Sequence, residues 1–281
     1  MVNVNGSMMA NNEAVISVFN RGFNYGDSVF ETLKVSYDKI LFLEDHYFRL
    51  MASMRILRME IPMNFTLEYI EDQIMQTVHA QHSSNNAHRV KIAVFRDSKG
   101  LYLPNNNNIG FIITNSILNQ SNYNLSTNPY TIDIYKDHFL AADLLSTLKS
   151  NNRIINTIGS IYAKENNLNN CLLLNTEKHV IEALNGNLFV VNKNIIKTPP
   201  LNDGCIKGVM RKQLIDIINA MSNYEIEEGS ISTFELQKAD EIFVTNVILG
   251  IQPVSSYRKK TYTCNVSKIL IEKLNLRLRL S

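Results

Sequence analysis

Four short segments of the chain carry residue types that could do chemistry. Lys149 lies between an apolar segment and the start of a predicted helix. A lysine in that position is most often a surface residue, but a partly buried one has a lowered pKa and can form a Schiff base. Glu182 interrupts an apolar strand, where a carboxylate needs a partner to offset its desolvation. Lys149 is thus a candidate for covalent chemistry, while a surface lysine and a strand-edge acid are the simpler interpretations.

Glycines or an arginine distinguish the other three candidate segments. Residues 204–211, GCIKGVMR, open a helix with two glycines, and the backbone amides of a helix N-terminus suit a phosphate group. Residues 20–32, NRGFNYGDSVFET, place two glycines, an aspartate and aromatic residues before a strand, which by composition alone favours an ordinary loop. Arg49 lies on a predicted helix with Asp45 one turn away, so an exposed ion pair is its commoner fate.

The composition is that of a globular protein. The chain has 281 residues, of which 45% are hydrophobic and 19% charged, and this excludes an intrinsically disordered chain. A formal net charge of +2 gives no electrostatic case for nucleic acid or for an anionic membrane surface. The N-terminus lacks the features of a signal peptide, and no stretch approaches the roughly 18 apolar residues that span a bilayer. Three scattered cysteines form neither a disulfide framework nor a metal cluster, which predicts a reducing, cytoplasmic location.

The elements that must position these residues follow a mixed pattern. In the first part of the chain, the sequence predicts a turn at residues 36–38, and Thr66 is the predicted N-cap of the second of two helices. Strands are predicted at Val15–Phe19, Ser28–Val35, Lys39–Leu43, Arg89–Arg96 and Ile109–Ser116, and helices at Glu44–Arg58 and from Thr66 to about His82.

The polar stretch that follows is the predicted interdomain linker, residues 118–127. Beyond it, helices are predicted at Asn151–Asn167, Ile206–Met221 and Ser267–Leu278, and strands at Cys171–Asn175, His179–Leu184, Asn187–Val191, Glu241–Thr245 and Leu249–Val254. The pattern fits two α+β domains of unequal size, a small N-terminal domain at 1–117 and a larger domain at 128–281.

Taken in order, these segments resemble the class IV, or fold-type IV, pyridoxal-phosphate enzymes. The family pattern runs D-R-G-F-x-Y-G-D-G-x-F-E-T, H-x-x-R-L, a Schiff-base Lys, E-x-x-x-x-N-x-F, T-P, G-x-x-x-G-[IV]-x-R and A-D-E-[IL]-x-x-[TC]-N through P-V. The chain matches these motifs in the same order between about residues 13 and 256, with Asn20 and Ser28 as departures. The resemblance implies a two-domain fold like that of D-amino-acid aminotransferase, with the larger C-terminal domain binding the cofactor.

The resemblance also implies pyridoxal 5'-phosphate as the cofactor and a role for each matched residue. Lys149 would hold the cofactor as a Schiff base and move the proton at the substrate carbon, and Glu182 would keep the pyridine nitrogen protonated. The phosphate would be bound by Arg49, by the backbone amides of Val209 and Met210, and by Asn246 and Val247. Phe30 and Arg153 would lie beside the substrate, and no metal is implied.

Within the family, local features look most like 4-amino-4-deoxychorismate lyase. Residues 149–153, KSNNR, match its K-x-x-N-R, and residues 208–211, GVMR, are close to its G-I-M-R. Phe30 stands where D-amino-acid transamination uses a Tyr. In the loop at 96–102, Leu101 stands where lyases often carry an Arg, so the two substrate carboxylates need other partners, of which Lys99 and Arg153 are candidates.

Two alternatives to the lyase remain open. One is a class IV aminotransferase acting on branched-chain or other amino acids. The other is a non-catalytic binding protein on this scaffold, which the presence of Lys149 disfavours. The resemblance further implies a small amine substrate and a homodimer in which a small-domain loop of one subunit partly walls the neighbour's active site, with no nucleic acid and no membrane involved.

Overall fold

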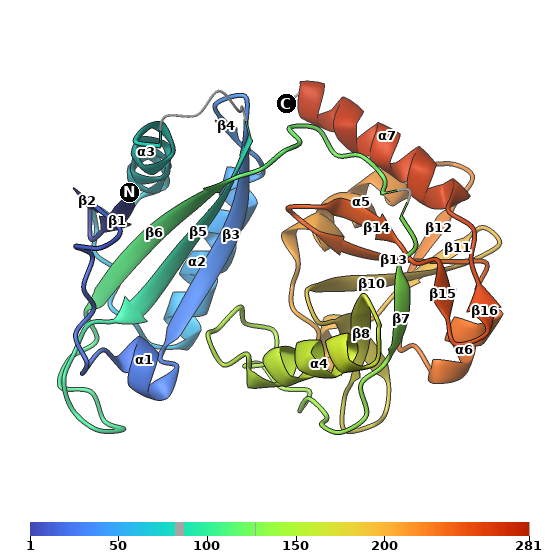
Figure 1. Ribbon diagram of the computed structural model, residues 1–281, viewed down its shortest axis with the longest axis horizontal. Helices are drawn as coiled ribbons and strands as arrows, with labels where there is room; N and C mark the ends of the chain where they lie inside the picture. The colour runs from blue at the N-terminus through green and yellow to red at the C-terminus, as the bar shows by residue number, and fades with distance from the viewer. Residues whose placement is uncertain (82–86, 127, 281) are drawn as a thin grey trace. The chain divides into compact units, whose positions relative to one another are not determined.

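A computed structural model describes residues 1–81, 87–126 and 128–280, which form two compact units (Figure 1). Unit 1 comprises Met1–Asn122 and Lys149–Asn152, and unit 2 comprises Tyr123–Leu148 and Arg153–Ser281. Residue 127 of the predicted linker and His82 of the second predicted helix lie outside the described residues. The domain boundaries predicted from the sequence stay a prediction. No helix in the described part of the chain is long and apolar enough to cross a membrane.

Unit 1 is an antiparallel sheet with two long helices on one face (Figure 1). Its strands lie in the order β2-β1-β6-β5-β3-β4. The elements are β1 (Val2–Val4), β2 (Ser7–Met9), α1 (Arg21–Tyr25), β3 (Ser28–Ser36), β4 (Lys39–Ile40), α2 (Leu43–Ile56), α3 (Leu67–His79), β5 (Ala87–Arg96) and β6 (Ile109–Ile117). The helices α2 and α3 begin and end close to where the sequence predicts them, and Thr66 caps α3 by accepting from the Tyr69 amide.

Alternation along β3 decides which side chains reach the core of unit 1. Val29, Leu33 and Val35 are buried in a cluster with residues of α2, α3 and β5. Because successive residues of a strand point to opposite faces, Phe30 and Lys34 lie on the other face of the sheet. One face of β3 therefore packs against the helices, and the other face carries Phe30, a candidate site residue.

The predicted strand at Val15–Phe19 is wrong. This segment forms no strand, and its Val15, Ile16, Val18 and Phe19 side chains are 51 to 81% exposed. Apolar β-branched residues favour a strand only where a neighbouring strand and a buried face exist, and the segment has neither within unit 1. The β1–β2 hairpin was not predicted, although its Asn5–Gly6 turn, with both residues at positive φ, is a hairpin signal.

Unit 2 is built on a ten-stranded mixed sheet. Its elements are β7 (Thr131–Ile134), α4 (Ile154–Glu165), β8 (Asn170–Leu174), β9 (Val180–Ala183), β10 (Gly186–Asn192), β11 (Ile195–Thr198), a 3-10 turn at Leu201–Asp203, α5 (Val209–Asn219), β12 (Glu225–Glu228), α6 (Thr233–Lys238), β13 (Glu241–Asn246), β14 (Gly250–Pro253), β15 (Ser256–Tyr257), β16 (Lys260–Thr261) and α7 (Asn265–Leu280). The three helices predicted in this part of the chain are present as α4, α5 and α7. The five predicted strands are present as β8, β9, β10, β13 and β14.

Strand β10 organises the sheet of unit 2. It pairs with β9 at its start, with β11 at its end and with β13 along most of its length. The buried Glu241 at the start of β13 accepts hydrogen bonds from the Val266 and Ser267 amides at 2.9 and 2.7 Å, so it caps the N-terminus of α7. β9, β10 and β13 thereby fix the backbone on which the predicted cofactor residues of unit 2 lie.

Candidate active site

Lys149 is held against strand β3 by backbone hydrogen bonds. The Phe30 amide donates to the Lys149 carbonyl at 2.8 Å, and the Asn151 amide donates to the Ser28 carbonyl at 3.0 Å. The short segment Lys149–Asn152 therefore extends the edge of β3 and belongs to unit 1. The half-buried Lys149 side chain is fixed at its base by this pairing rather than by a helix.

Two ammonium groups lie over the ring of Phe30. The Lys149 Nζ atom is 4.4 Å from the ring centroid and the Lys91 Nζ atom, from β5, is 4.5 Å from it. Both distances fit cation–π contacts. Burial, and then the charge of Arg89, lowers the pKa of Lys91. The structure thus brings together Lys149 and Phe30, which the sequence singled out, and adds Lys91, which it did not.

Arg49 is engaged by a buried carboxylate from the neighbouring strand. Its Nε and Nη2 atoms donate to the two oxygens of Glu31 at 2.7 and 2.5 Å, and His46 Nδ1 lies 2.7 Å from Glu31 Oε2. Burial of Glu31 opposes its ionisation, but the charge and hydrogen bonds of Arg49 and His46 outweigh it and lower its pKa to about 2. The phosphate contact that the family resemblance implies for Arg49 stays a prediction.

The pKa of His46 depends on the charged groups around it. Burial lowers its pKa, the hydrogen bond and charge of Glu31 oppose this, and the positive charges of Arg49 and Lys149 lower it further. A neutral His46 that donates from Nδ1 to Glu31 fits this environment, and its buried Nε2 has no hydrogen-bond partner among the described residues. His46 of the Arg49–Glu31–His46 cluster therefore interacts electrostatically with Lys149.

In unit 2, Glu182 lies in the middle of strand β9 and is 3% exposed. Its Oε2 atom accepts a hydrogen bond from the Ile206 amide at 2.9 Å, which ties β9 to the segment that precedes α5. Burial, and then the negative charge of Glu182, raises the pKa of the nearby Cys205 thiol to about 12. Glu182 is thus a buried carboxylate of the kind that could pair with a protonated ring nitrogen.

The N-terminus of α5 has the features of an anion site. Gly208 precedes it, no side chain caps it, and Val209 and Met210 supply its first amides. Asn187 of β10 donates from Nδ2 to the Ile206 carbonyl at 2.8 Å and thereby lies against the Gly208 backbone. A Cβ atom at Gly208 would collide with Asn187 Oδ1, so glycine permits a close backbone approach here. Uncapped amides at a helix N-terminus are suited to a phosphate.

Asn246 is the last residue of strand β13, which pairs with β10, and Val247 follows it. The Asn246 side chain accepts hydrogen bonds from the Ile248 and Leu249 amides and donates to the Asn185 carbonyl at 3.2 Å. The Val247 carbonyl accepts from the buried Tyr123 hydroxyl at 2.6 Å. These bonds hold the turn in a fixed shape, as a phosphate-binding turn would require.

Arg153 precedes α4 and turns back along the chain. Its guanidinium donates to the Leu148 carbonyl, the residue directly before Lys149. This contact joins the residues on either side of the short segment that carries Lys149, and the substrate contact predicted for Arg153 stays a prediction. Lys99, the other candidate for a substrate carboxylate, is exposed on the loop after β5.

The chain is similar to enzymes of more than one activity. It is 28% identical over 259 residues to the "Putative branched-chain-amino-acid aminotransferase" of Methanocaldococcus jannaschii, covering 89% of this chain and 85% of that protein. It is 25% identical over 237 residues to the aminodeoxychorismate lyase of Vibrio harveyi, covering 84% of each. Because both identities are low, neither one assigns the specific reaction.

Solved structures show the same fold. A "Putative 4-amino-4-deoxychorismate lyase" from Legionella pneumophila superposes with a TM-score of 0.82 at 26% identity, covering 95% of this chain and 96% of that one. The T.th. branched-chain amino acid aminotransferase with pyridoxamine 5'-phosphate gives 0.84 at 23% identity, covering 97% and 91%. The predicted two-domain α+β fold is therefore confirmed. A sequence model described as amino-transferase class IV matches residues 28–257, so the chain belongs to the class IV aminotransferase family.

Proposed function

We propose that this protein is a 4-amino-4-deoxychorismate lyase that releases pyruvate and 4-aminobenzoate. The cofactor is pyridoxal phosphate, which, when bound, supplies an electron sink for negative charge at the substrate carbon. The observation that carries the proposal is the second ammonium, Lys91, beside the ring that also contacts Lys149. The substrate has two carboxylates, and a cation next to the reacting lysine offers one of them a partner.

The residues of each unit fit this cofactor. Gly208 and the uncapped start of α5 support phosphate binding by the Val209 and Met210 amides, and the turn at Asn246–Val247 supports it further. Glu182, buried and close to the Ile206 amide, would keep the ring nitrogen protonated. Arg49 is the further phosphate contact that the family resemblance implies.

Lys149 has two tasks in this proposal. It would hold the cofactor and release it to the substrate amine, and its amine would then remove the proton at the amine-bearing ring carbon. Loss of that proton aromatises the ring and breaks the bond to the enolpyruvyl oxygen. Enolpyruvate takes up a proton and leaves as pyruvate, so one substrate gives one 4-aminobenzoate and one pyruvate.

Branched-chain transamination is the alternative, and the similarity to the Methanocaldococcus jannaschii protein supports it. The experiment that separates the two is pyruvate release from 4-amino-4-deoxychorismate by the purified, cofactor-loaded protein. Catalytic pyruvate with an equal amount of 4-aminobenzoate supports the lyase. Absence of pyruvate, together with conversion of leucine, isoleucine or valine to their keto acids, contradicts it and supports the aminotransferase. Lys149→Ala protein should show neither activity and lose the cofactor's visible absorption.

We also propose that the protein is a homodimer. An apolar patch of unit 1, hereafter the N-terminal patch, supports this: its side chains are 72 to 89% exposed, namely Val15, Val18, Phe19, Phe23, Leu101, Tyr102 and Leu103. Arg21 joins its two segments by donating to the Gly100, Leu101 and Tyr102 carbonyls. A group of exposed apolar side chains joined in this way is typical of an interface, and a second copy of this chain is the partner we propose.

A further inference from the structure

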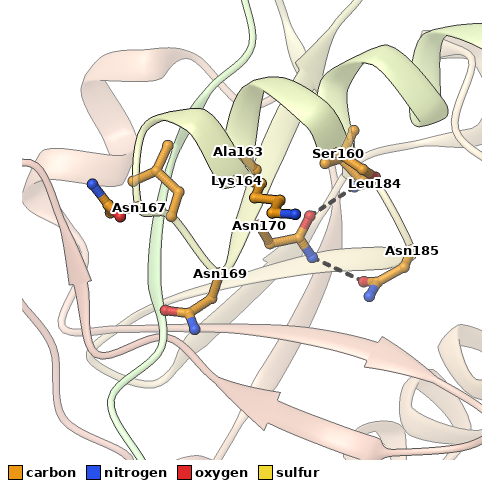
Figure 2. Close-up of a pocket in the computed structure, with 9 residues that line it drawn as sticks. Ser160, Ala163, Lys164, Asn167, Asn169, Asn170, Leu184 and Asn185 are labelled. Atoms are coloured by element: carbon orange, nitrogen blue, oxygen red, sulfur yellow. Dashed lines mark hydrogen bonds between the residues drawn. The ribbon is translucent and has the colours of Figure 1, made fainter.

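A cavity of about 490 Å³ lies in unit 2 between the C-terminal half of α4 and the β9–β10 turn (Figure 2). Its size falls within the range of small-molecule sites, roughly 300 to 1,000 Å³. None of its lining residues is among those assigned above to the cofactor or to the substrate. The cavity shares no lining residue with the proposed cofactor site and adjoins its Asn246–Val247 turn through Asn185, whose carbonyl accepts from Asn246.

The amide groups on its polar wall are oriented by the protein. Asn170, which is 2% exposed, accepts from the Cys171 and Leu184 amides through Oδ1 and donates from Nδ2 to Asn185 Oδ1 at 2.8 Å. This fixes the Asn185 amide with its oxygen toward Asn170, as Figure 2 shows. Asn169 likewise accepts from the Thr131 amide at 2.7 Å through Oδ1. Both Asn169 and Asn185 have their oxygens engaged, so what they offer a ligand is an N–H donor.

Asn170 has a further partner outside the cavity lining. The Tyr130 hydroxyl accepts from Asn170 Nδ2 at 2.9 Å. Together with the bond to Asn185, this contact fixes the Asn170 amide group before any ligand binds.

The charge of the cavity is positive. Lys164 lines it, and among its described lining residues there is no carboxylate. Two carbonyls near the end of α4 are already bonded, because the Leu168 amide donates to the Ala163 carbonyl at 2.8 Å and the Asn167 amide to the Lys164 carbonyl at 3.2 Å. A helix C-terminus whose carbonyls are already bonded attracts a cation poorly. The cavity therefore favours an anion.

The apolar part of the lining consists of Ala163, Leu168 and Leu184. Leu168 and Leu184 pack against a buried cluster that includes Ala163, so this wall continues the core of unit 2. We propose that the cavity binds a small organic carboxylate with an apolar body, whose carboxylate contacts Lys164 and the asparagine amides while its body covers Leu168 and Leu184.

Benzoate is a suitable probe, and benzamide is its uncharged counterpart of nearly the same shape. In protein labelled with ¹³C at alanine and leucine methyl groups, benzoate should shift the Ala163, Leu168 and Leu184 signals saturably, and benzamide should not. Lys149→Ala protein should retain the benzoate shifts, which separates this cavity from the proposed active site. Methyl signals that stay still, or that respond equally to both compounds, would overturn the proposal.

Two variants test the charge and the space separately. Lys164→Gln should weaken benzoate about three- to fivefold, the size expected of an exposed ion pair. Lys268→Gln, an exposed lysine on α7 of the same unit, is the matched control and should leave the affinity unchanged. Ser160→Leu, at an exposed helical position on the rim, should fill the cavity and abolish the saturable shift. Equal affinities in the two lysine variants, or full binding by Ser160→Leu, would contradict the assignment.

Discussion

At the scale of single residues, the buried carboxylate of Glu31 joins strand β3 to helix α2. Its pKa falls from 4.5 to about 2, since the interactions with Arg49 and His46 outweigh the cost of burial. A lowered carboxyl pKa stabilises the fold above the unfolded value, and the benefit is lost as the pH falls from about 4.5 toward 2. Removing the charge would also leave Arg49 with a poorer partner in a nearly buried position.

We therefore expect Glu31→Gln to lower the free energy of unfolding by about 3 kcal/mol at pH 7. The difference from wild type should narrow steadily between pH 4.5 and pH 3, as measured by urea unfolding at each pH. Glu71→Gln, an exposed acid on α3, is the control and should change stability by less than about 0.5 kcal/mol. A pH-independent difference would show that the loss is one of packing rather than of charge.

Lys91 gives a second test at this scale, because it competes with Lys99 as the partner of a substrate carboxylate. Lys91 is half-buried beside Phe30, whereas Lys99 is exposed. Loss of a charge-assisted hydrogen bond costs about 1.5 to 3 kcal/mol. Lys91→Gln should therefore raise KM for aminodeoxychorismate tenfold or more with little change in kcat, and Lys91→Arg should restore most of the affinity.

Lys99→Gln is the matched comparison, since it removes the same charge from the loop after β5. Its KM should stay within about twofold of wild type, in line with the small effect of exposed charges. The reverse outcome, a high KM only in the Lys99 variant, would move the carboxylate contact to the loop and exclude Lys91.

Single residues also show where the sequence was sufficient and where it was not. Lys149 and Glu182 were candidates whose simpler interpretations were a surface lysine and a strand-edge acid, and the family resemblance gave them their predicted roles. The structure shows that Lys149 is half-buried and that Glu182 is buried within β9. Lys91 does not stand out, because its relation to Phe30 depends on the register in which β3 pairs with β5. Such cross-strand contacts follow from pairing and not from local spacing, so the sequence could not predict them.

At the scale of elements, the start of α5 makes a sharp prediction. Gly208 has an ordinary negative φ, so a substitution there is limited by space and not by backbone strain. Alanine would collide with Asn187 Oδ1, the side chain that also holds the Ile206 carbonyl. Gly208→Ala should shift the first turn of α5 and weaken pyridoxal phosphate binding to the apoprotein at least about tenfold, measured by absorbance titration.

Gly229→Ala serves as the control for this variant. A Cβ atom at Gly229 meets the ends of the Glu227 and Lys197 side chains, which can move away. Its cofactor affinity should equal that of wild type. If Gly208→Ala also binds with wild-type affinity, the phosphate does not lie at the N-terminus of α5.

Elements were predicted best where the apolar pattern was long and one face was buried. The regular spacing of apolar residues in α2, α3 and α5 identified these helices to within a few residues. Strand β12, Glu225–Glu228, was missed because three of its four residues are acidic, as suits an edge strand that pairs only with β11. Val15–Phe19 failed for the opposite reason, since its apolar residues lie on the surface.

At the scale of the whole molecule, the exposed apolar residues of Val15–Phe19 indicate a surface that another protein chain could cover. The N-terminal patch combines them with Leu101, Tyr102 and Leu103 on a loop that Arg21 clamps, and Arg21 itself is held by Asp27 at 2.9 Å. Asp27 also binds Arg96 at 2.9 Å, so the loop is joined to the end of β5 by an ion-pair network. Exposed apolar side chains on such a braced surface are well placed to be buried against a second copy of the chain.

The dimer can be tested apart from catalysis by sedimentation velocity across a range of concentrations. Wild-type protein should sediment as a dimer, and Phe23→Ser combined with Leu103→Ser should weaken association at least about tenfold, because central apolar contacts dominate interface energies. Met63→Ser removes a fully exposed apolar side chain of unit 1 outside the patch and should leave the dimer intact. A monomeric wild type, or a double variant that dimerises as tightly as wild type, would mean that the N-terminal patch is not the contact between subunits.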